Sequence, residues 1–262
     1  TEIYTLSLHD ALPIYQKAKE YHEKALAIAI EIGNKRGEGT SYGNLGAVFD
    51  SCGEYQKAKE YYEEALAIAI EIGDKLGEGT SYGNLGAVFH SLGKYQKAKE
   101  YYEEALAIAI EIGDRRGEGT TYGNLGDVFH SLSKNQKAKE YHEKALAIAI
   151  EAGDKRGEGT GYGNLGAVFV SRGEYQKAEE YYGEALAIAI EIGDRPGEGR
   201  MNGNLGVVFH SLSEYQKAKE YHEKALAIAI EIGDKRGEGT SYGNLGAMFQ
   251  SLGEYQRSEE HT

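Results

Sequence analysis

An asparagine that recurs every forty residues is the side chain with the clearest capacity for molecular recognition in this sequence. Its carboxamide donates and accepts hydrogen bonds at once, so it can read a peptide bond rather than a side chain. Asparagine is also an indifferent helix former, and burying it without partners costs free energy. The six copies, here called the asparagine ladder, are Asn44, Asn84, Asn124, Asn164, Asn204 and Asn244.

Patterns that would indicate catalysis or metal binding are missing from the sequence. Serine and histidine recur as columns of a repeat, and neither GxxxxGK[ST] nor HExxH occurs. The glycine-rich stretch GEGTSYGNLG follows a predicted helix, whereas a dinucleotide-binding turn follows a strand. His90, His130 and His210 share one column, and units roughly 10 Å apart hold them too far from one another to share a metal ion. We predict a non-catalytic protein with no metal site and no cofactor.

The composition argues against two further classes of partner. The 262 residues carry a net charge of −13, whereas proteins that bind nucleic acid need lysine and arginine to displace counterions from phosphate. No run of 18 apolar residues is present, so we expect no membrane span. The lone Cys52 cannot form a disulfide within the chain, which favours a cytoplasmic location. We expect the partner to be a protein or peptide.

These columns belong to a forty-residue repeat that runs without a gap. GNLG falls at Gly43, Gly83, Gly123, Gly163, Gly203 and Gly243. YQKAKEY begins at Tyr15, Tyr55, Tyr95 and Tyr215, with the variants NQKAKEY at Asn135 and YQKAEEY at Tyr175. A repeat unit buries its apolar face against its neighbours, so this periodicity outranks any local propensity as evidence for the fold.

Each unit is predicted to form two helices. Asp74 is a suitable N-cap for the first helix, and Gly93 ends it in a left-handed conformation. The second helix is predicted from about Lys94 to Ile112, with an amphipathic first half. Ile108 and Ile110 widen its apolar stripe, so we expect the second half to be buried on two sides.

The glycine content, 36 residues, also follows the repeat. Six glycines recur in each unit, and two of them mark helix ends. The other four lie in or near a helix, where each costs roughly 0.5–1 kcal/mol relative to alanine. We expect them to permit the close approach of a neighbouring helix or of a ligand backbone.

The spacing of large and small residues resembles the tetratricopeptide repeat. That pattern is aromatic-x2-Leu-Gly-x2-aromatic, followed by Ala-x3-aromatic and a small residue. Here it reads Tyr42, Leu45, Gly46, Phe49, Ala58, Tyr62 and Ala65, and it recurs from Tyr15 to Gln256. The resemblance implies an all-α fold, an α-solenoid of antiparallel helix pairs that forms a right-handed superhelix.

Two departures from the usual repeat refine the resemblance. Ile70 and its equivalents replace the proline after the second helix, and the period is forty rather than thirty-four residues. This longer form resembles the repeats of the G-protein signalling modulator (Pins/LGN-like) group and, less closely, those of kinesin light chains.

The resemblance also implies a role for the ladder. In such arrays the first helix lines a concave groove, and the matching asparagine often holds a ligand's backbone. The alternative is that the amide bonds to a neighbouring helix and stiffens the stack. The signalling modulators often place an arginine four residues before the ladder asparagine, and here only Arg200, before Asn204, has this position. Their second asparagine is replaced by Ala47, Ala87, Asp127, Ala167, Val207 and Ala247.

Two functions remain open from the sequence. The first is an interaction scaffold that binds an extended peptide in the groove through the ladder and Arg200. The second is a sensing or self-assembly array of a larger protein whose protease or nucleotide-switch domain lies outside this sequence. A chaperone-tail clamp is not expected, because Gly43 and Ala47 supply no basic residue to the groove. We further expect self-association through uncapped ends, since no polar capping unit is present.

The two ends of the chain do not belong to the repeat. Back-translation of residues 1–14 with one choice of codons gives DNA that resembles a common sequencing adapter, and residues 257–262 resemble the opposite adapter. We therefore expect both segments to be translated library scars. A native N-terminal cap or a degenerate signal peptide is the alternative, although no basic segment precedes the apolar stretch. Residues 15–256 would then hold one second helix, five full units and a final first helix.

Overall fold

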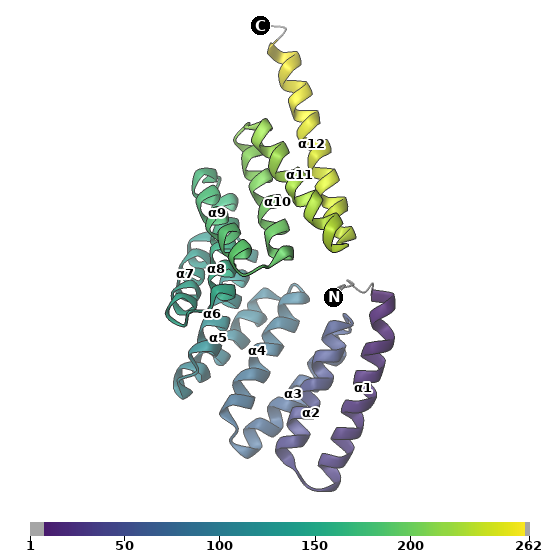
Figure 1. Cartoon of the computed structure of the whole chain (residues 1–262). Helices are drawn as coiled ribbons and strands as arrows, with labels where there is room; N and C mark the ends of the chain where they lie inside the picture. The colour runs from purple at the N-terminus through teal and green to yellow at the C-terminus, as the bar shows by residue number, and fades with distance from the viewer. Residues whose placement is uncertain (1–7, 260–262) are drawn as a thin grey trace. The chain divides into compact units, whose positions relative to one another are not determined.

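The computed structural model describes residues 8–259, and this part of the chain is built from helices without any strand (Figure 1). The helices are α1 (Leu8–Glu31), α2 (Lys35–Ser51), α3 (Tyr55–Ile72), α4 (Lys75–Ser91), α5 (Tyr95–Ile112), α6 (Arg115–Ser131), α7 (Asn135–Glu151), α8 (Lys155–Ser171), α9 (Tyr175–Glu191), α10 (Arg195–Ser211), α11 (Tyr215–Ile232) and α12 (Lys235–Glu259). Even-numbered helices are the first helices of the units, and odd-numbered helices are the second. The predicted all-α solenoid of helix pairs is confirmed.

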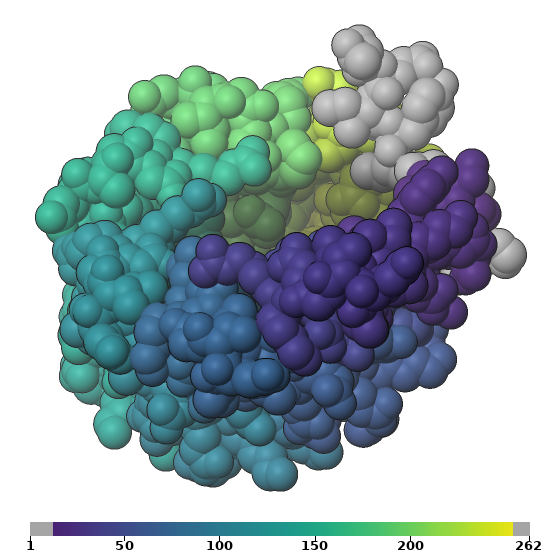
Figure 2. Space-filling model, turned by 90° about the horizontal axis from the view of Figure 1, so that it is seen from below, coloured from purple at the N-terminus to yellow at the C-terminus, as the bar shows by residue number. Residues whose placement is uncertain are grey.

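The described chain divides into two compact parts, residues 8–148 and residues 149–259, and each part is described by itself. Within each part, consecutive helices pack against one another, as α2 does on α3 and α10 on α11. First helices also contact each other directly, as α2 does α4. Around α3 to α5 the side chains form a continuous packed surface (blue in Figure 2). None of the described helices holds a stretch that is apolar and long enough to cross a bilayer.

Helix boundaries follow from caps that the sequence predicts. The Asp74 side chain accepts a hydrogen bond from the backbone N–H of Gly77 at 3.1 Å, which begins α4. Gly93, just beyond the end of α4, has φ +69°, the left-handed conformation that glycine adopts at little cost. Two units carry serine at this turn instead, and Ser133 has φ +55°.

The first helices approach the second helices through glycine. A Cβ atom placed on Gly86 would lie 2.7 Å from the ring of Tyr102, which is buried in the core. Gly79 likewise meets Ile108, with its methyl carbon 3.1 Å from the position of a Cβ. The predicted use of these glycines, close approach of a neighbouring helix, is confirmed at both positions. Gly83 differs, because a Cβ there would meet nothing within 4 Å.

The second half of the second helix is not buried on both sides, which corrects the sequence-based expectation. Ile108 is buried against the first helix of its own unit, but Ile110 is more than half exposed. The same exposure recurs at Ile30, Ile70, Ile150, Ile190 and Ile230. A solenoid unit offers the second helix neighbours on one side only, so no further layer covers the face that carries this column.

The last helix departs from the boundaries of its equivalents. The stretch SLGEYQ at Ser251 to Gln256 is helical, and α12 continues to Glu259, whereas the equivalent SLGKYQ at Ser91 to Gln96 contains the turn between α4 and α5. The turn in the other units is held by a second helix that packs back on the first, and no such helix follows α12 in the described chain. Of the predicted terminal scars, residues 8–14 and 257–259 continue α1 and α12, whereas residues 1–7 and 260–262 lie outside the described residues.

Candidate functional site

The asparagine ladder lies on the first helices with its amides unused. Each of its members is half-buried or exposed, one residue before a leucine of the repeat. Within residues 8–259, none of the six amides makes a hydrogen bond to another part of the protein. The alternative role, bonding to a neighbouring helix, therefore has no hydrogen bond to carry it in the described chain. Both the donor and the acceptor of each amide remain open to a ligand.

A pocket of about 480 Å³ lies between α2 and α4 and is floored by α3. Thr40 and Asn44 line it from α2, and Asn84 lines it from α4. Ile68 and Ile72 of α3 provide an apolar floor. We call this the α2–α4 pocket. Its combination of an apolar floor with a few polar groups is typical of a binding site.

The pocket recurs one unit further along. The α4–α6 pocket has a volume of about 350 Å³ and lies between α4 and α6 over α5. Asn84 and Asn124 line it, with Ile108 and Ile112 in the floor. Asn84 thus lines both pockets, and the ladder runs from one pocket into the next. Gly83, whose missing side chain leaves open space, also lines the second pocket.

The sequence-based prediction of the site did not include the arginines that line the pockets. Arg36 lines the α2–α4 pocket, where its guanidinium lies 3.2 Å from the carboxylate of Asp74. Arg116 lines the α4–α6 pocket in the same way. The sequence-based expectation rested on the Gly43 and Ala47 columns, whereas arginine is the second residue of four of the six first helices in the described chain. The repeated KRGEG was the available signal.

Leu76 interrupts this arginine column. It takes the place of Arg36 in its unit, lines both pockets and is more than half exposed. Leu76 adds an apolar side chain to the α2–α4 pocket beside Ile72 and to the α4–α6 pocket beside Ile112, and both isoleucines are also partly exposed. The rim of the pockets therefore combines cationic groups with one apolar segment.

The order and packing of these helices match known repeat proteins. The tetratricopeptide repeat family matches residues 15–71, 51–111, 77–151, 117–191, 157–231 and 197–261. The chain belongs to the tetratricopeptide repeat family. Proteins with this fold are commonly interaction scaffolds, and this chain has the architecture of one. None of the curated proteins searched matches the chain.

Solved tetratricopeptide structures share its fold at low sequence identity. BtubC (BKLC) from P. vanneervenii is 24% identical with a TM-score of 0.72, covering 87% of this chain and 93% of that one. Nearly identical repeats of a kinesin light chain-like protein from Podosopora anserina are 20% identical, with a TM-score of 0.62 and coverage of 75% and 97%. A Rap protein complexed with competence and sporulation factor is 18% identical, with a TM-score of 0.69 and coverage of 85% and 65%.

The predicted site residue Arg200 lies at a much smaller pocket. This pocket, within residues 149–259, has a volume of only about 30 Å³ and is lined by Arg156, Arg200 and Met201, among others. Met201 takes the place of serine, threonine or glycine in the other repeats, and its sulfur lies 3.6 Å from the Cβ position of Gly163. The methionine side chain thus occupies space between α8 and α10, whereas the equivalent space between α2 and α4 is open. Neither Asn164 nor Asn204 lines this pocket.

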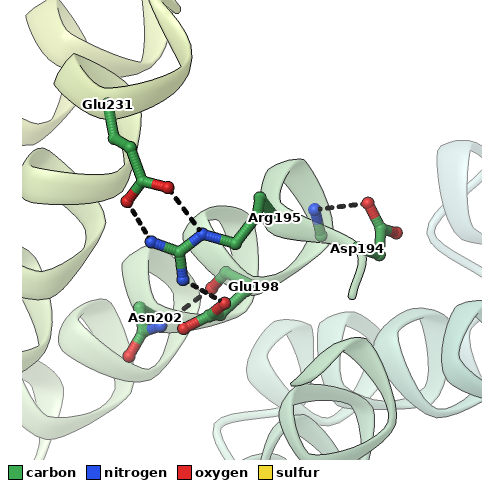
Figure 3. Close-up of polar contacts among 6 residues, drawn as sticks. Asp194, Arg195, Glu198, Asn202 and Glu231 are labelled. Atoms are coloured by element: carbon green, nitrogen blue, oxygen red, sulfur yellow. Dashed lines mark hydrogen bonds and ion pairs between the residues drawn. The ribbon is translucent and has the colours of Figure 1, made fainter. Parts of the chain in front are cut away.

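Helix α10, which carries Arg200, diverges most from its equivalents. Arg195 binds Glu231 of α11 and Glu198 of its own helix (Figure 3), with Nε lying 3.1 Å from a Glu231 carboxylate oxygen. Asn202 is buried where other units have tyrosine, and its amide donates to the Glu198 carbonyl at 2.9 Å. Because one guanidinium binds two carboxylates, the N-terminus of α10 is held against α11.

Asp127 is the one carboxylate in a column of otherwise small apolar residues. It lies 3.7 Å from Nε2 of His142, whose ring is buried against Gly126. Burial raises the pKa of Asp127 to about 6. Burial, reinforced by the nearby His130, lowers the pKa of His142 to about 4. The described residues contain no group of three His, Cys, Asp or Glu side chains placed to hold a metal ion.

Proposed function

We propose that the chain is a non-catalytic scaffold that binds an extended peptide along its first helices, with the ladder amides holding the peptide backbone. The observation that carries the proposal is the row of amides without protein partners that line consecutive pockets. An amide that is satisfied within the protein would gain nothing from a ligand, whereas an unused one forms two new hydrogen bonds.

The pockets also indicate the side chains that such a peptide would carry. Apolar side chains fit the floor formed by Ile68 and Ile72, and their burial there supplies the hydrophobic part of the affinity. Acidic side chains fit the rim at Arg36 and Arg116, since a guanidinium binds a carboxylate through paired hydrogen bonds. Arg200 would serve the same purpose at the smaller pocket. We therefore expect a peptide in which apolar and acidic residues alternate with small ones.

The test uses peptides selected from a random display library on the intact chain. Peptide affinity is measured by fluorescence anisotropy for the wild-type chain and for the Asn84→Ala/Asn124→Ala double variant. Loss of the hydrogen bonds from two amides, roughly 1 kcal/mol each, should weaken binding by about tenfold or more. The matched control is Gln96→Ala, which removes an exposed amide from α5 away from both pockets. Equal affinity for the double variant and the control would remove the ladder from the site.

The second function predicted from the sequence is a sensing or self-assembly array of a larger protein. A sensor also binds a ligand through its repeats, so the ladder test applies to it unchanged. It adds a switching domain beyond these residues, which a sequence of the full gene would reveal. Self-assembly needs a contact between chains instead.

A further inference from the structure

The isoleucine column of the second helices exposes large apolar side chains in units that have neighbours on both sides. Ile70 is 53% exposed and Ile110 is 55% exposed, although α3 packs against α2 and α4, and α5 against α4 and α6. Their exposure is therefore a property of complete internal units. Successive residues of a helix lie about 100° apart around its axis, so Ile70 faces away from Ile68 and Ile72, which floor the α2–α4 pocket. The column thus forms a surface separate from the pockets.

Helices α3 and α5 place two members of the column side by side. Both helices pack on α4, and side chains from both join one core cluster around Leu85. Packed units lie roughly 10 Å apart, so Ile70 and Ile110 are separated by about this distance. An exposed alanine lies one turn before each isoleucine. We call these four residues the α3–α5 patch: Ala67, Ile70, Ala107 and Ile110.

An excess of negative charge surrounds the patch. From Glu60 to Ile72, α3 has four glutamates and no basic residue, and residues 100–112 of α5 have the same sequence. Lysines neutralise only three of these carboxylates, in the pairs Lys59–Glu63, Lys99–Glu103 and Lys35–Glu71. Glu64 and its equivalent Glu104 are exposed, and neither forms an ion pair within the described residues. These carboxylates are therefore available to a cationic partner.

Helix α11 carries the same apolar column with less negative charge. Ile230 is 53% exposed, as Ile70 is. Lys224 takes the place that Glu64 and Glu104 have in α3 and α5, and its Nζ lies 4.9 Å from the centroid of the Tyr221 ring. This helix presents an equally exposed isoleucine without the same excess of charge, so it serves as an internal control for the patch.

The free carboxylates beside exposed isoleucines indicate the charge of the partner. The patch of a second copy would place glutamate against glutamate, and such like-charge contacts are unfavourable. Nucleic acid and anionic membrane surfaces are disfavoured for the same reason. Apolar side chains flanked by lysine or arginine match the patch in both respects.

The distance between the two isoleucines indicates the conformation of the partner. Residues i and i+7 of a helix lie about 10.5 Å apart on the same face, which matches the spacing of the units. An extended strand covers roughly 10 Å in three residues, but residues three apart in a strand point to opposite faces. A helix can therefore contact Ile70 and Ile110 at once, whereas a strand cannot.

We propose that the α3–α5 patch binds a basic amphipathic helix of a partner protein. The helix lies across α3 and α5, with apolar side chains on Ile70 and Ile110 and with lysine or arginine side chains near the glutamates of both helices. This partner has the opposite charge to the peptide expected in the pockets. The contact uses another face of the second helices, so it is independent of the asparagine ladder and of the function proposed for it.

A synthetic peptide of about 18 residues, with leucine along one helical face and lysine elsewhere, tests the proposal. Its affinity for the intact chain is measured by fluorescence anisotropy, and a peptide of equal composition with leucines on all sides serves as the reference. The amphipathic peptide should bind roughly tenfold more tightly than the reference. Ile110→Gln should weaken its binding about fivefold, because an apolar contact is lost. The matched control Ile230→Gln, on α11, should bind like the wild-type chain.

A second pair of variants tests the contribution of charge. Glu64→Lys/Glu104→Lys gives α3 and α5 the lysine that α11 carries naturally, so both helices should form as before. It should weaken binding of the amphipathic peptide by about tenfold or more, and added salt should weaken the wild-type complex as well. Glu220→Lys/Glu223→Lys makes the same change in net charge on α11 and should weaken binding far less. Circular dichroism should show equal helicity for all variants.

Three results would each overturn the proposal. Undetectable binding, or equal affinity for the two peptides, would mean that the patch does not recognise an amphipathic helix. An equal effect of Ile110→Gln and Ile230→Gln would place the binding elsewhere on the chain. Asn84→Ala/Asn124→Ala should bind this peptide like the wild-type chain, so a loss of affinity in that variant would place the peptide in the pockets instead.

Discussion

At the scale of single residues, the turn after a first helix shows the free-energy cost of a side chain in a left-handed backbone conformation. Gly93 and Ser133 occupy the same position with φ of +69° and +55°. An L-residue pays roughly 1 kcal/mol or more in this left-handed region, where glycine pays little. Ser133→Gly should therefore raise the free energy of unfolding by about 1 kcal/mol, and the urea midpoint should rise with it. The reverse exchange, Gly93→Ser, should lower the midpoint by a similar amount; a Ser133→Gly midpoint at or below wild type would show that the serine is not strained.

The Asp127 carboxylate gives the chain a residue-level dependence on pH. Its pKa is raised from the ordinary value of 3.8 to about 6 in the folded chain, so the folded state binds more protons than the unfolded state between these values. Stability contributed by this residue therefore falls as pH rises through that window. Half of the side chain is exposed, so screening limits the effect to about 1 kcal/mol.

The same window holds an opposing group. The pKa of His142 is lowered to about 4, so the unfolded state binds the extra proton, and stability from His142 rises with pH. Asp127→Ala should thus stabilise the chain at pH 7 and have a smaller effect near pH 4.5, and its stability should climb more steeply with pH than that of the wild type. Urea unfolding at several pH values measures both slopes. A gain that is equal at all pH values would indicate helix propensity alone, and Ala167→Ser, in the same column, gives the effect of an uncharged polar change.

At the scale of elements, the sequence predicts what is local and repeated. Caps such as Asp74 and turn glycines such as Gly93 act within a few residues, so the boundaries of α4 follow from the sequence alone. Exposure of Ile110 could not be predicted in this way, because an apolar stripe does not tell whether a second layer covers it. The helical continuation of α12 to Glu259 could not be predicted either, because its turn sequence forms a turn only when a second helix packs against the first.

The candidate site was predictable to a similar extent. The ladder was visible because an identical polar residue recurs at a fixed interval on a helix. Which column lines a pocket depends on the angle between neighbouring helices, and that angle is set by packing across units. Arg36 and Leu76 were therefore missed, and the filling of the Arg200 pocket by Met201 could not be foreseen.

At the scale of the whole molecule, stability should follow the number of units. In a solenoid each unit contributes an intrinsic term and one interface with its neighbour, so an internal unit adds both. Insertion of a second copy of residues 75–114 after Asp114 extends the repeat without changing any contact type, because α4 and α5 already pack as the new pair would. At roughly 0.05–0.15 kcal/mol per residue, the insertion should add about 2–6 kcal/mol to the free energy of unfolding.

Urea unfolding measures this gain, and the slope of the free energy against urea should increase as well, since more surface is exposed on unfolding. The matched control inserts a glycine–serine segment of equal length at the same point, which adds residues without an interface and should lower the midpoint. An insertion of the repeat that leaves both the midpoint and the slope unchanged would mean that distant units unfold separately. The chain would then act as short independent blocks, and a peptide bound across consecutive pockets would stabilise only the block that it contacts.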